Sequence, residues 1–210
     1  MEIPFILSMD LHTVKYTPLG GSSYISLPKF LAAKKAIINL KNEDDECFKW
    51  AITRALNPVE KNFERIDKEL RETSKDLNWE GLKFPVNKFE KHNSSMSVNV
   101  FGYDKLVYPL RISEHNYKGE STVNLLLISD DTKPHYCWIK DISKLISSQT
   151  SKNSHVRHVC FRCLNTFNTE KSLASHHEYC NHTKLYKLNF PKRERKYLLK
   201  ITIDQCGFHL

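Results

Sequence analysis

Four residues of metal-ligand type at fixed spacing constrain this chain more than any other feature. Two residues separate Cys160 from Cys163, twelve separate Cys163 from His176, and three separate His176 from Cys180. A C-x2-C turn can direct both thiolates at one cation, and His176 and Cys180 fall on the same face of a helix. Three sulfur ligands and one nitrogen ligand close a tetrahedron without an open position. The spacing therefore predicts a structural Zn²⁺ site rather than a catalytic one.

The apolar residues between the two ligand pairs fit the same unit. Phe167 and Leu173 complete the pattern C-x2-C-x3-F-x5-L-x2-H-x3-C. This pattern resembles the C2H2-type ββα zinc finger, in which the Phe and the Leu form a small core. The one departure is Cys180 in place of the usual second histidine, and zinc accepts either ligand. The resemblance implies a finger over residues 155–183 that folds around the metal.

Positive charge is concentrated in the last third of the chain. Residues 151–210 contain 11 Lys and Arg against 4 Asp and Glu, and the formal net charge of all 210 residues is +8. A basic segment of this kind predicts an anionic partner, most simply DNA or RNA. A solvated basic tail, or a finger that docks on its own chain or on another protein, remains an alternative.

Any nucleic-acid binding is expected to be weak and non-specific. The positions of a ββα finger that contact bases are occupied here by Thr169, Ser172 and Ser175. None of these side chains can make the bidentate contacts that carry base specificity. Phosphates are therefore the expected targets. The candidate phosphate-binding residues are Arg157, Arg162, Lys171, Lys192, Arg193, Arg195 and Lys196.

Ahead of the cysteine motif, the apolar residues first recur at helical spacing. In the acidic run at residues 42–46, Asp44 or Asp45 can cap the start of a helix, and Cys47 and Trp50 then fall on one helical face, which predicts a first helix. Residues 59–75 carry apolar side chains three and four positions apart and predict a second, amphipathic helix that starts at Pro58.

Strand-like patterns follow the two helices. Asp141 can then cap a short helix through Leu145. The predicted fold class is α+β: two helices, then a mostly antiparallel sheet, followed by one small ββα zinc finger. The expected strands cover residues 97–101, 106–112, 122–128 and 135–139. The expected parts are a poorly determined segment at 1–41, the α+β domain at 42–146, a Ser-rich linker at 147–154, the finger at 155–183 and a basic tail at 184–210.

Cysteine usage and hydropathy bear on the compartment. Three of the six cysteines belong to the metal motif, which suits a reducing compartment better than a disulfide framework. No apolar run reaches the length of a membrane span. We expect an intracellular, nuclear protein and no membrane partner.

An enzymatic alternative rests on Cys47 and His135. A cysteine at a helix start and a histidine on a later strand follow the order of papain-like and ovarian-tumour-type cysteine peptidases. The neighbouring acids would raise the pKa of Cys47, and Cys137 stands where an orienting Asn or Asp is expected. Asp141 is the remaining candidate for that third group. We expect Cys47 to be packed and unreactive, and the chain not to be an enzyme.

Several blocks in order resemble proteins of Maverick/Polinton-type DNA transposons. In that family this region lies ahead of a protein-primed family B DNA polymerase. The resemblance covers roughly residues 30–185, and the segment at 197–204 resembles a trace of the first exonuclease strand. It implies an N-terminal region without the polymerase catalytic part, or a decayed transposon fragment with a protein-interaction finger. The blocks are residues 42–50, 79–85, 99–103, 123–128 and 135–140.

Overall fold

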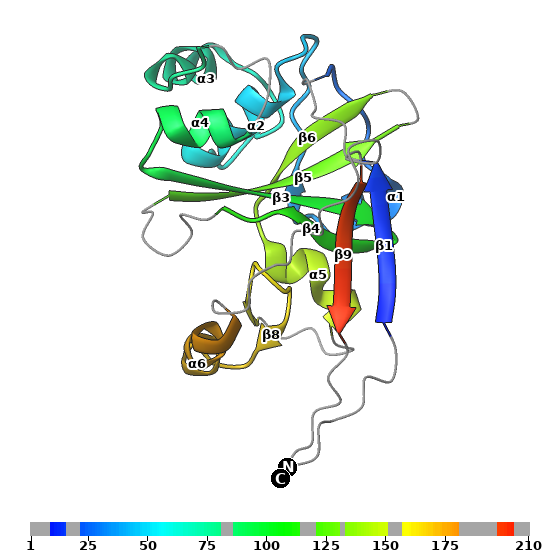
Figure 1. Cartoon of the computed structure of the whole chain (residues 1–210). Helices are drawn as coiled ribbons and strands as arrows, with labels where there is room; N and C mark the ends of the chain where they lie inside the picture. The colour runs from blue at the N-terminus through cyan, green and yellow to red at the C-terminus, as the bar shows by residue number, and fades with distance from the viewer. Residues whose placement is uncertain are drawn as a thin grey trace, which may run out of the picture. The chain divides into compact units, whose positions relative to one another are not determined.

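Figure 1 shows the computed structural model of the chain, which divides into two compact units. Residues 18–183 form the larger unit, and residues 1–17 with 184–210 form the smaller one. In the smaller unit, β1 (Met9–Lys15) pairs antiparallel with β9 (Tyr197–Ile203). A strand near residue 197 was expected, but its pairing with the other end of the chain was not. The described residues are 9–15, 22–80, 86–113, 121–130, 133–150, 157–180 and 197–203.

The centre of the larger unit is a five-stranded sheet with the strand order β2-β6-β5-β3-β4. Its neighbouring strands pair antiparallel, except that β3 and β5 run parallel. The predicted mostly antiparallel sheet is therefore confirmed. The strands are β2 (Ile37–Ile38), β3 (Met96–Asp104), β4 (Leu106–Arg111), β5 (Ser121–Ser129) and β6 (Pro134–Ile139).

More helices accompany this sheet than the two before it and the short one after it that were expected. The first predicted helix is present as α2, but the second is shorter than predicted. Residues 59–67 are not helical, because Asn62 adopts a positive φ of 53° and the Asp67 side chain caps a helix that starts after it. The helices are α1 (Lys29–Ala33), α2 (Cys47–Leu56), α3 (Lys68–Thr73), the 3-10 turn η1 (Ser74–Asp76), α4 (Val86–His92) and α5 (Ile142–Thr150).

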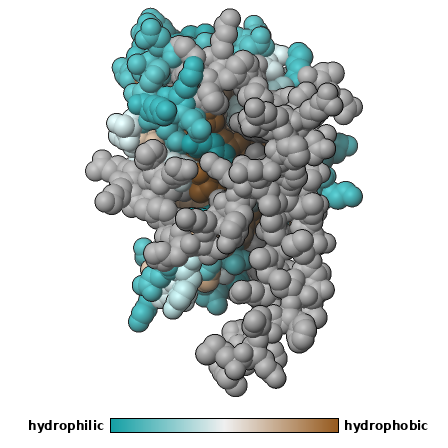
Figure 2. Space-filling model, viewed as in Figure 1, coloured by the Kyte–Doolittle hydropathy of each residue, from teal (hydrophilic) through white to brown (hydrophobic). Residues whose placement is uncertain are grey.

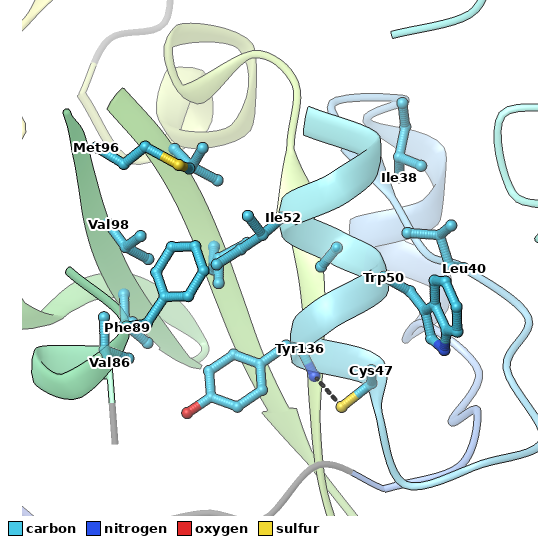
Figure 3. Packing of buried hydrophobic residues seen from close by; sticks show 14 of the residues in the cluster. Ile38, Leu40, Cys47, Trp50, Ile52, Val86, Phe89, Met96, Val98 and Tyr136 are labelled. Carbon is cyan, nitrogen blue, oxygen red and sulfur yellow. Dashed lines mark hydrogen bonds between the residues drawn. The ribbon is translucent and has the colours of Figure 1, made fainter. Parts of the chain in front are cut away.

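The first apolar cluster fills the space between one face of the sheet and helices α2, α3 and α4 (Figure 3). Trp50 and Ile52 of α2 and Phe89 of α4 are buried against strand residues such as Val98 and Tyr136. The exposed sides of α3 and α4 are hydrophilic, as Figure 2 shows from the same viewpoint as Figure 1. The helices thus bury one stripe each, as amphipathic helices on a sheet do.

The second apolar cluster lies on the opposite face of the sheet. Leu31 of α1 and Leu145 and Ile146 of α5 are buried there against strand residues such as Cys137 and Leu126. Side chains alternate along a strand, so Tyr136 belongs to the first cluster and Cys137 to the second. The result is a layer of helices on each face of the sheet.

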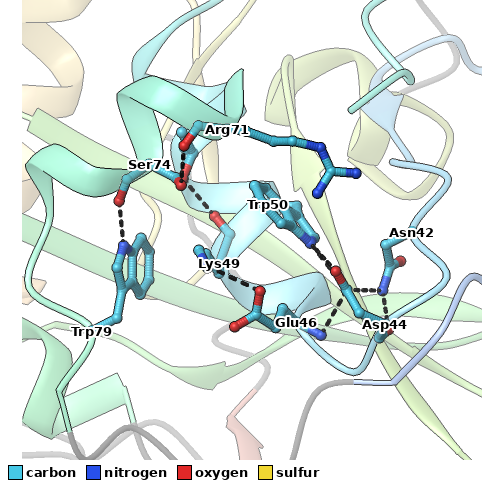
Figure 4. Close-up of polar contacts among 9 residues, drawn as sticks. Asn42, Asp44, Glu46, Lys49, Trp50, Arg71, Ser74 and Trp79 are labelled. Carbon is cyan, nitrogen blue, oxygen red and sulfur yellow. Dashed lines mark hydrogen bonds and ion pairs between the residues drawn. The ribbon is translucent and has the colours of Figure 1, made fainter. Parts of the chain in front are cut away.

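Polar side chains fix the turn before α2, where the acidic run was expected to cap the helix (Figure 4). Glu46 occupies the cap position without a capping side-chain bond. The Asp44 carboxylate instead accepts hydrogen bonds from the Glu46 amide at 3.0 Å and from Trp50 Nε1 at 3.0 Å. The capping prediction is wrong in detail, because Glu46 and not Asp44 or Asp45 stands at the cap position. Asp44 instead anchors the Trp50 indole that α2 buries.

An ion pair between a buried carboxylate and a half-buried guanidinium ties α4 to the sheet. Glu90 of α4 is buried, accepts a hydrogen bond from the Val98 amide at 2.7 Å, and pairs with the Arg111 guanidinium of β4. Arg111 also donates to Asn87 Oδ1 of α4 at 2.8 Å. Next to it, the Tyr108 ring covers Gly102 so closely that a Cβ there would lie 2.7 Å from the ring.

Helix α5 begins as expected and extends into the predicted linker. Asp141 caps it by accepting from the Lys144 amide at 2.9 Å. The Gln149 side chain bonds to β4 twice: its Oε1 accepts from the Val107 amide at 2.8 Å, and its Nε2 donates to the Val107 carbonyl at 3.0 Å. Residues 147–150 are therefore helical and not a linker, and residues 151–156 lie outside the described part of the chain.

Candidate metal centre

A small ββα unit follows α5. Strands β7 (His158–Val159) and β8 (Thr166–Phe167) pair antiparallel, and helix α6 (Glu170–Cys180) comes next. Between the strands the chain makes a tight turn: the Leu164 amide donates to the Cys160 carbonyl at 2.7 Å, and Leu164 adopts a positive φ of 62°. Thr169 Oγ1 accepts from the Ser172 amide at 3.1 Å and caps α6.

The turn and the helix bring the four predicted ligands together. One ligand atom from each of Cys160, Cys163, His176 and Cys180 lies within 4.8 Å of the others. Cys163 Sγ is 3.3 Å from His176 Nε2, and Cys160 Sγ is 3.9 Å from Cys180 Sγ. Around Zn²⁺, with bonds of about 2.3 Å to sulfur and about 2.0 Å to nitrogen, tetrahedral edges would be about 3.5 to 3.8 Å. The group can therefore hold a metal ion of this size.

The predicted finger core supports one of these ligands. The Phe167 ring lies 4.7 Å from the His176 ring, centroid to centroid, and both Phe167 and Leu173 are half-buried. None of the residues of α6 is fully buried. The helix is therefore attached to its unit mainly through the ligand cluster and this ring contact.

The thiols of the cluster cannot all ionise by themselves. A hydrogen bond from Cys163 lowers the pKa of Cys160 to about 4. The same hydrogen bond raises the pKa of Cys163, and burial together with the negative charge on Cys160 raises the pKa of Cys180. Negative charges packed this closely repel one another, and a divalent cation between them would remove that repulsion.

The ββα unit is packed on the α+β layers through the turn that carries the first two ligands. Val159 and Leu164, which flank that turn, are buried in the second apolar cluster with Leu145 and Ile146 of α5. The Arg157 amide also donates to Ser143 Oγ of α5 at 3.2 Å. A finger that docks on its own chain was one of the alternatives that the sequence left open, but the residues that make the contact were not identified.

Three of the seven basic residues expected to bind phosphate lie in the described part of the chain. Arg157 and Arg162 are half-buried, at the entry to β7 and in the cysteine turn, whereas Lys171 is exposed on α6. At the expected base-reading positions, the Thr169 and Ser172 hydroxyls lie 2.8 Å apart and bond to each other. The remaining candidates, Lys192, Arg193, Arg195 and Lys196, lie outside the described residues.

Cys47 is buried, as expected. It is the first residue of α2, it is 1% exposed, and its sulfur accepts hydrogen bonds from the amides of Ser22 at 3.3 Å and Tyr136 at 3.4 Å (Figure 3). Burial raises the pKa of Cys47, and the Asp44 carboxylate adds to this, while the backbone amides oppose it. The thiol form is therefore favoured, which is unsuited to a nucleophile.

His135 points away from Cys47. Its Nε2 lies 2.8 Å from Asn39 Oδ1, and Cys137 Sγ donates to the same oxygen at 3.4 Å. His135 and Cys137 therefore share one face of β6, opposite the face on which α2 packs. Asp141 is used as the cap of α5. The orienting partner of His135 is Asn39. Sequence reasoning did not identify it, because Asn39 directly follows β2 and lies 96 residues before His135 in the chain.

The structure thus brings the four metal ligands together and does not assemble the alternative Cys47–His135–Asp141 site. Among the described residues, no helix is both long and apolar enough to cross a membrane. The chain matches no protein-family model, no curated protein and no solved structure.

Proposed function

We propose that the chain is a zinc-binding module that associates with nucleic acid. The observation that carries the proposal is the group of Cys160, Cys163, His176 and Cys180, whose ligand atoms all lie within 4.8 Å of one another. Among divalent ions, Zn²⁺ is favoured by three thiolates and one imidazole in tetrahedral geometry. With four protein ligands the metal would be structural.

The nucleic-acid part of the proposal is supported by charge. Residues 151–210 carry 11 basic and 4 acidic side chains, and Lys171 is exposed beside the candidate metal site. Such a surface binds phosphates without base readout, so we infer weak, salt-sensitive binding of DNA or RNA. We also propose that the chain is similar to the N-terminal region of a Maverick/Polinton-type polymerase protein. Its proposed location is the nucleus.

A second candidate function is a structural one, in which the ββα unit packs on its own chain. Val159 and Leu164 bury the cysteine turn in the second apolar cluster, so the ββα unit has an intramolecular packing role. In this alternative the metal stabilises the fold, and the exposed side of α6 contacts another protein or nothing. A decayed transposon fragment would have the same architecture.

Metal analysis tests the first part. The purified chain is expected to contain about one zinc ion per molecule, and Cys160→Ser is expected to lose it because three ligands hold zinc less tightly than four. Cys206→Ser is the matched control, since this cysteine lies outside the motif. Equal zinc content in Cys160→Ser and Cys206→Ser would refute the assignment.

A salt titration tests the second part. Binding to duplex DNA is expected to weaken as salt rises, with a slope of log K against log salt of about −0.9 for each phosphate that the chain neutralises. Absence of binding at low salt would leave the intramolecular and protein-binding alternative.

A further inference from the structure

A pocket of about 530 Å³ lies where four segments of the larger unit meet. Its walls come from Lys35 in the turn after α1, Asn124 of β5, the end of β6 with the start of α5, and the entry to the ββα unit. This volume is within the range of sites that hold small organic ligands.

The pocket is lined by more positive than negative side chains. Lys35, Lys140, Lys144 and Arg157 contribute four cations, and Asp141 contributes the one carboxylate among its lining residues. Asp141 already accepts the capping hydrogen bond from the Lys144 amide. Within the described part of the chain, Lys35, Lys140 and Lys144 form no ion pair. Like charges that converge in a concave site attract an anion strongly.

Backbone hydrogen bonds fix the segments that carry these cations. Lys35 adopts a positive φ of 50°, which turns the chain after α1. The next carbonyl, of Ala36, accepts hydrogen bonds from the amides of Lys140 at 2.9 Å and Asp141 at 3.1 Å. The Arg157 amide is bound to Ser143 Oγ of α5. The backbone of the pocket is therefore pre-formed, so a ligand would order side chains there but not chain segments.

The pocket also has an aromatic wall. Phe161, in the cysteine turn, is half-buried and lines the pocket together with the cations. Cations that follow a phosphate backbone, combined with an aromatic ring for a base, are the recognition elements of single-stranded nucleic acid. In a duplex the faces of a base are covered by its stacked neighbours, so a ring inside a pocket can stack only on an unpaired base.

We propose that this pocket holds one unpaired nucleotide of a single-stranded nucleic acid, with its phosphates at the lysines and its base against Phe161. The inference rests on the proposed function and narrows it, from nucleic acid in general to single strands. It also gives the ββα unit a purpose in the binding site: the unit supplies Arg157 and Phe161, while the α+β layers supply the lysines.

The test compares two triple variants by fluorescence anisotropy with an oligothymidine of about 15 nucleotides. One variant is Lys35→Ala, Lys140→Ala and Lys144→Ala. The matched control is Lys61→Ala, Lys88→Ala and Lys91→Ala, which removes the same charge from exposed positions before α3 and on α4. The pocket triple is expected to weaken binding about tenfold or more and to reduce the salt slope by about 2, since each phosphate contact on a single strand contributes about 0.7.

A third variant addresses stacking. Phe161→Leu keeps an apolar side chain in the cysteine turn but removes the ring face. It is expected to weaken binding to the oligothymidine about fivefold or more, with unchanged affinity for a duplex of the same length. Zinc content and melting temperature are measured for every variant, and the lysine variants decide the question if Phe161→Leu proves unstable.

The outcomes separate this inference from the proposed function. Equal losses in the two triple variants, or equal affinity for single strand and duplex, would overturn the pocket and leave general nucleic-acid binding intact. Wild-type protein that binds neither at low salt would overturn both. A mononucleotide that binds as tightly as the oligothymidine would show a free-nucleotide site and overturn the single-strand assignment.

Discussion

His135 shows how a single buried residue makes folding depend on pH. It is 0% exposed, and burial lowers its pKa, so the folded chain favours the neutral ring. The unfolded chain then binds more protons below the ordinary histidine pKa of about 6.5, and stability is lost as pH falls through that value. We expect the free energy of unfolding to fall between about pH 7 and pH 5 by more in the wild type than in His135→Gln. Equal pH dependence in urea titrations of both would contradict this.

Cys47 supplies a second test at the scale of one residue. Its thiol is buried and its pKa is raised, so iodoacetamide is expected to label Cys47 far more slowly in the folded chain than in urea. Cys137, which is also buried with a raised pKa, should behave alike and serves as the internal control. Peptide mass spectrometry measures both rates. Fast labelling of Cys47 alone would revive the peptidase alternative.

At the scale of the elements, the packing of the ββα turn on α5 should make a measurable contribution to the free energy of unfolding. Leu164 is 6% exposed in the second apolar cluster, whereas Leu173 of α6 is only half-buried. Leu164→Ala is expected to cost about 2–5 kcal/mol of unfolding free energy, and Leu173→Ala less. Denaturant titrations of zinc-loaded protein check this. A smaller loss for Leu164→Ala than for Leu173→Ala would mean that the turn is not packed on α5 in solution.

The attachment of α4 rests on the ion pair between buried Glu90 and half-buried Arg111. Arg111→Met leaves the Glu90 carboxylate buried with only the Val98 amide as partner, and should cost about 3–5 kcal/mol. The double variant Glu90→Gln, Arg111→Met keeps the Val98 hydrogen bond and removes the charge. We therefore expect it to be more stable than Arg111→Met alone, by chemical denaturation. A double variant that is less stable than Arg111→Met would contradict the prediction that the unpaired Glu90 charge causes the loss.

Residue spacing in the sequence predicted the helices, strands and metal ligands better than it predicted which of them contact one another. The α2 face, the strands and the metal ligands follow from spacing within a few turns of chain, and each was foreseeable. The end of the predicted second helix was not, because it depends on the backbone of Asn62 and the cap at Asp67. The exact partners of Asn39 and Val159 depend on which strands and helices become neighbours, and local spacing in a single sequence does not identify them.

At the scale of the molecule, the metal should stabilise the core and not only the ββα unit. Val159 and Leu164 complete the second apolar cluster, while all three tryptophans lie in or against the first cluster on the other face of the sheet. Chelation of the metal is expected to lower the midpoint of thermal unfolding seen by tryptophan fluorescence. Loss of zinc with an unchanged tryptophan transition would show that the ββα unit unfolds alone.

The pair of hydrogen bonds between Gln149 and Val107 has a further consequence. Strand β4 is the last strand of its sheet, and a last strand offers unpaired amides and carbonyls to any extended chain that meets it. The Gln149 side chain occupies one such amide and one such carbonyl, as a neighbouring strand would. Pro109, two residues further on, has no amide to offer. Helix α5 thus protects the sheet against edge-to-edge aggregation with other copies of the chain.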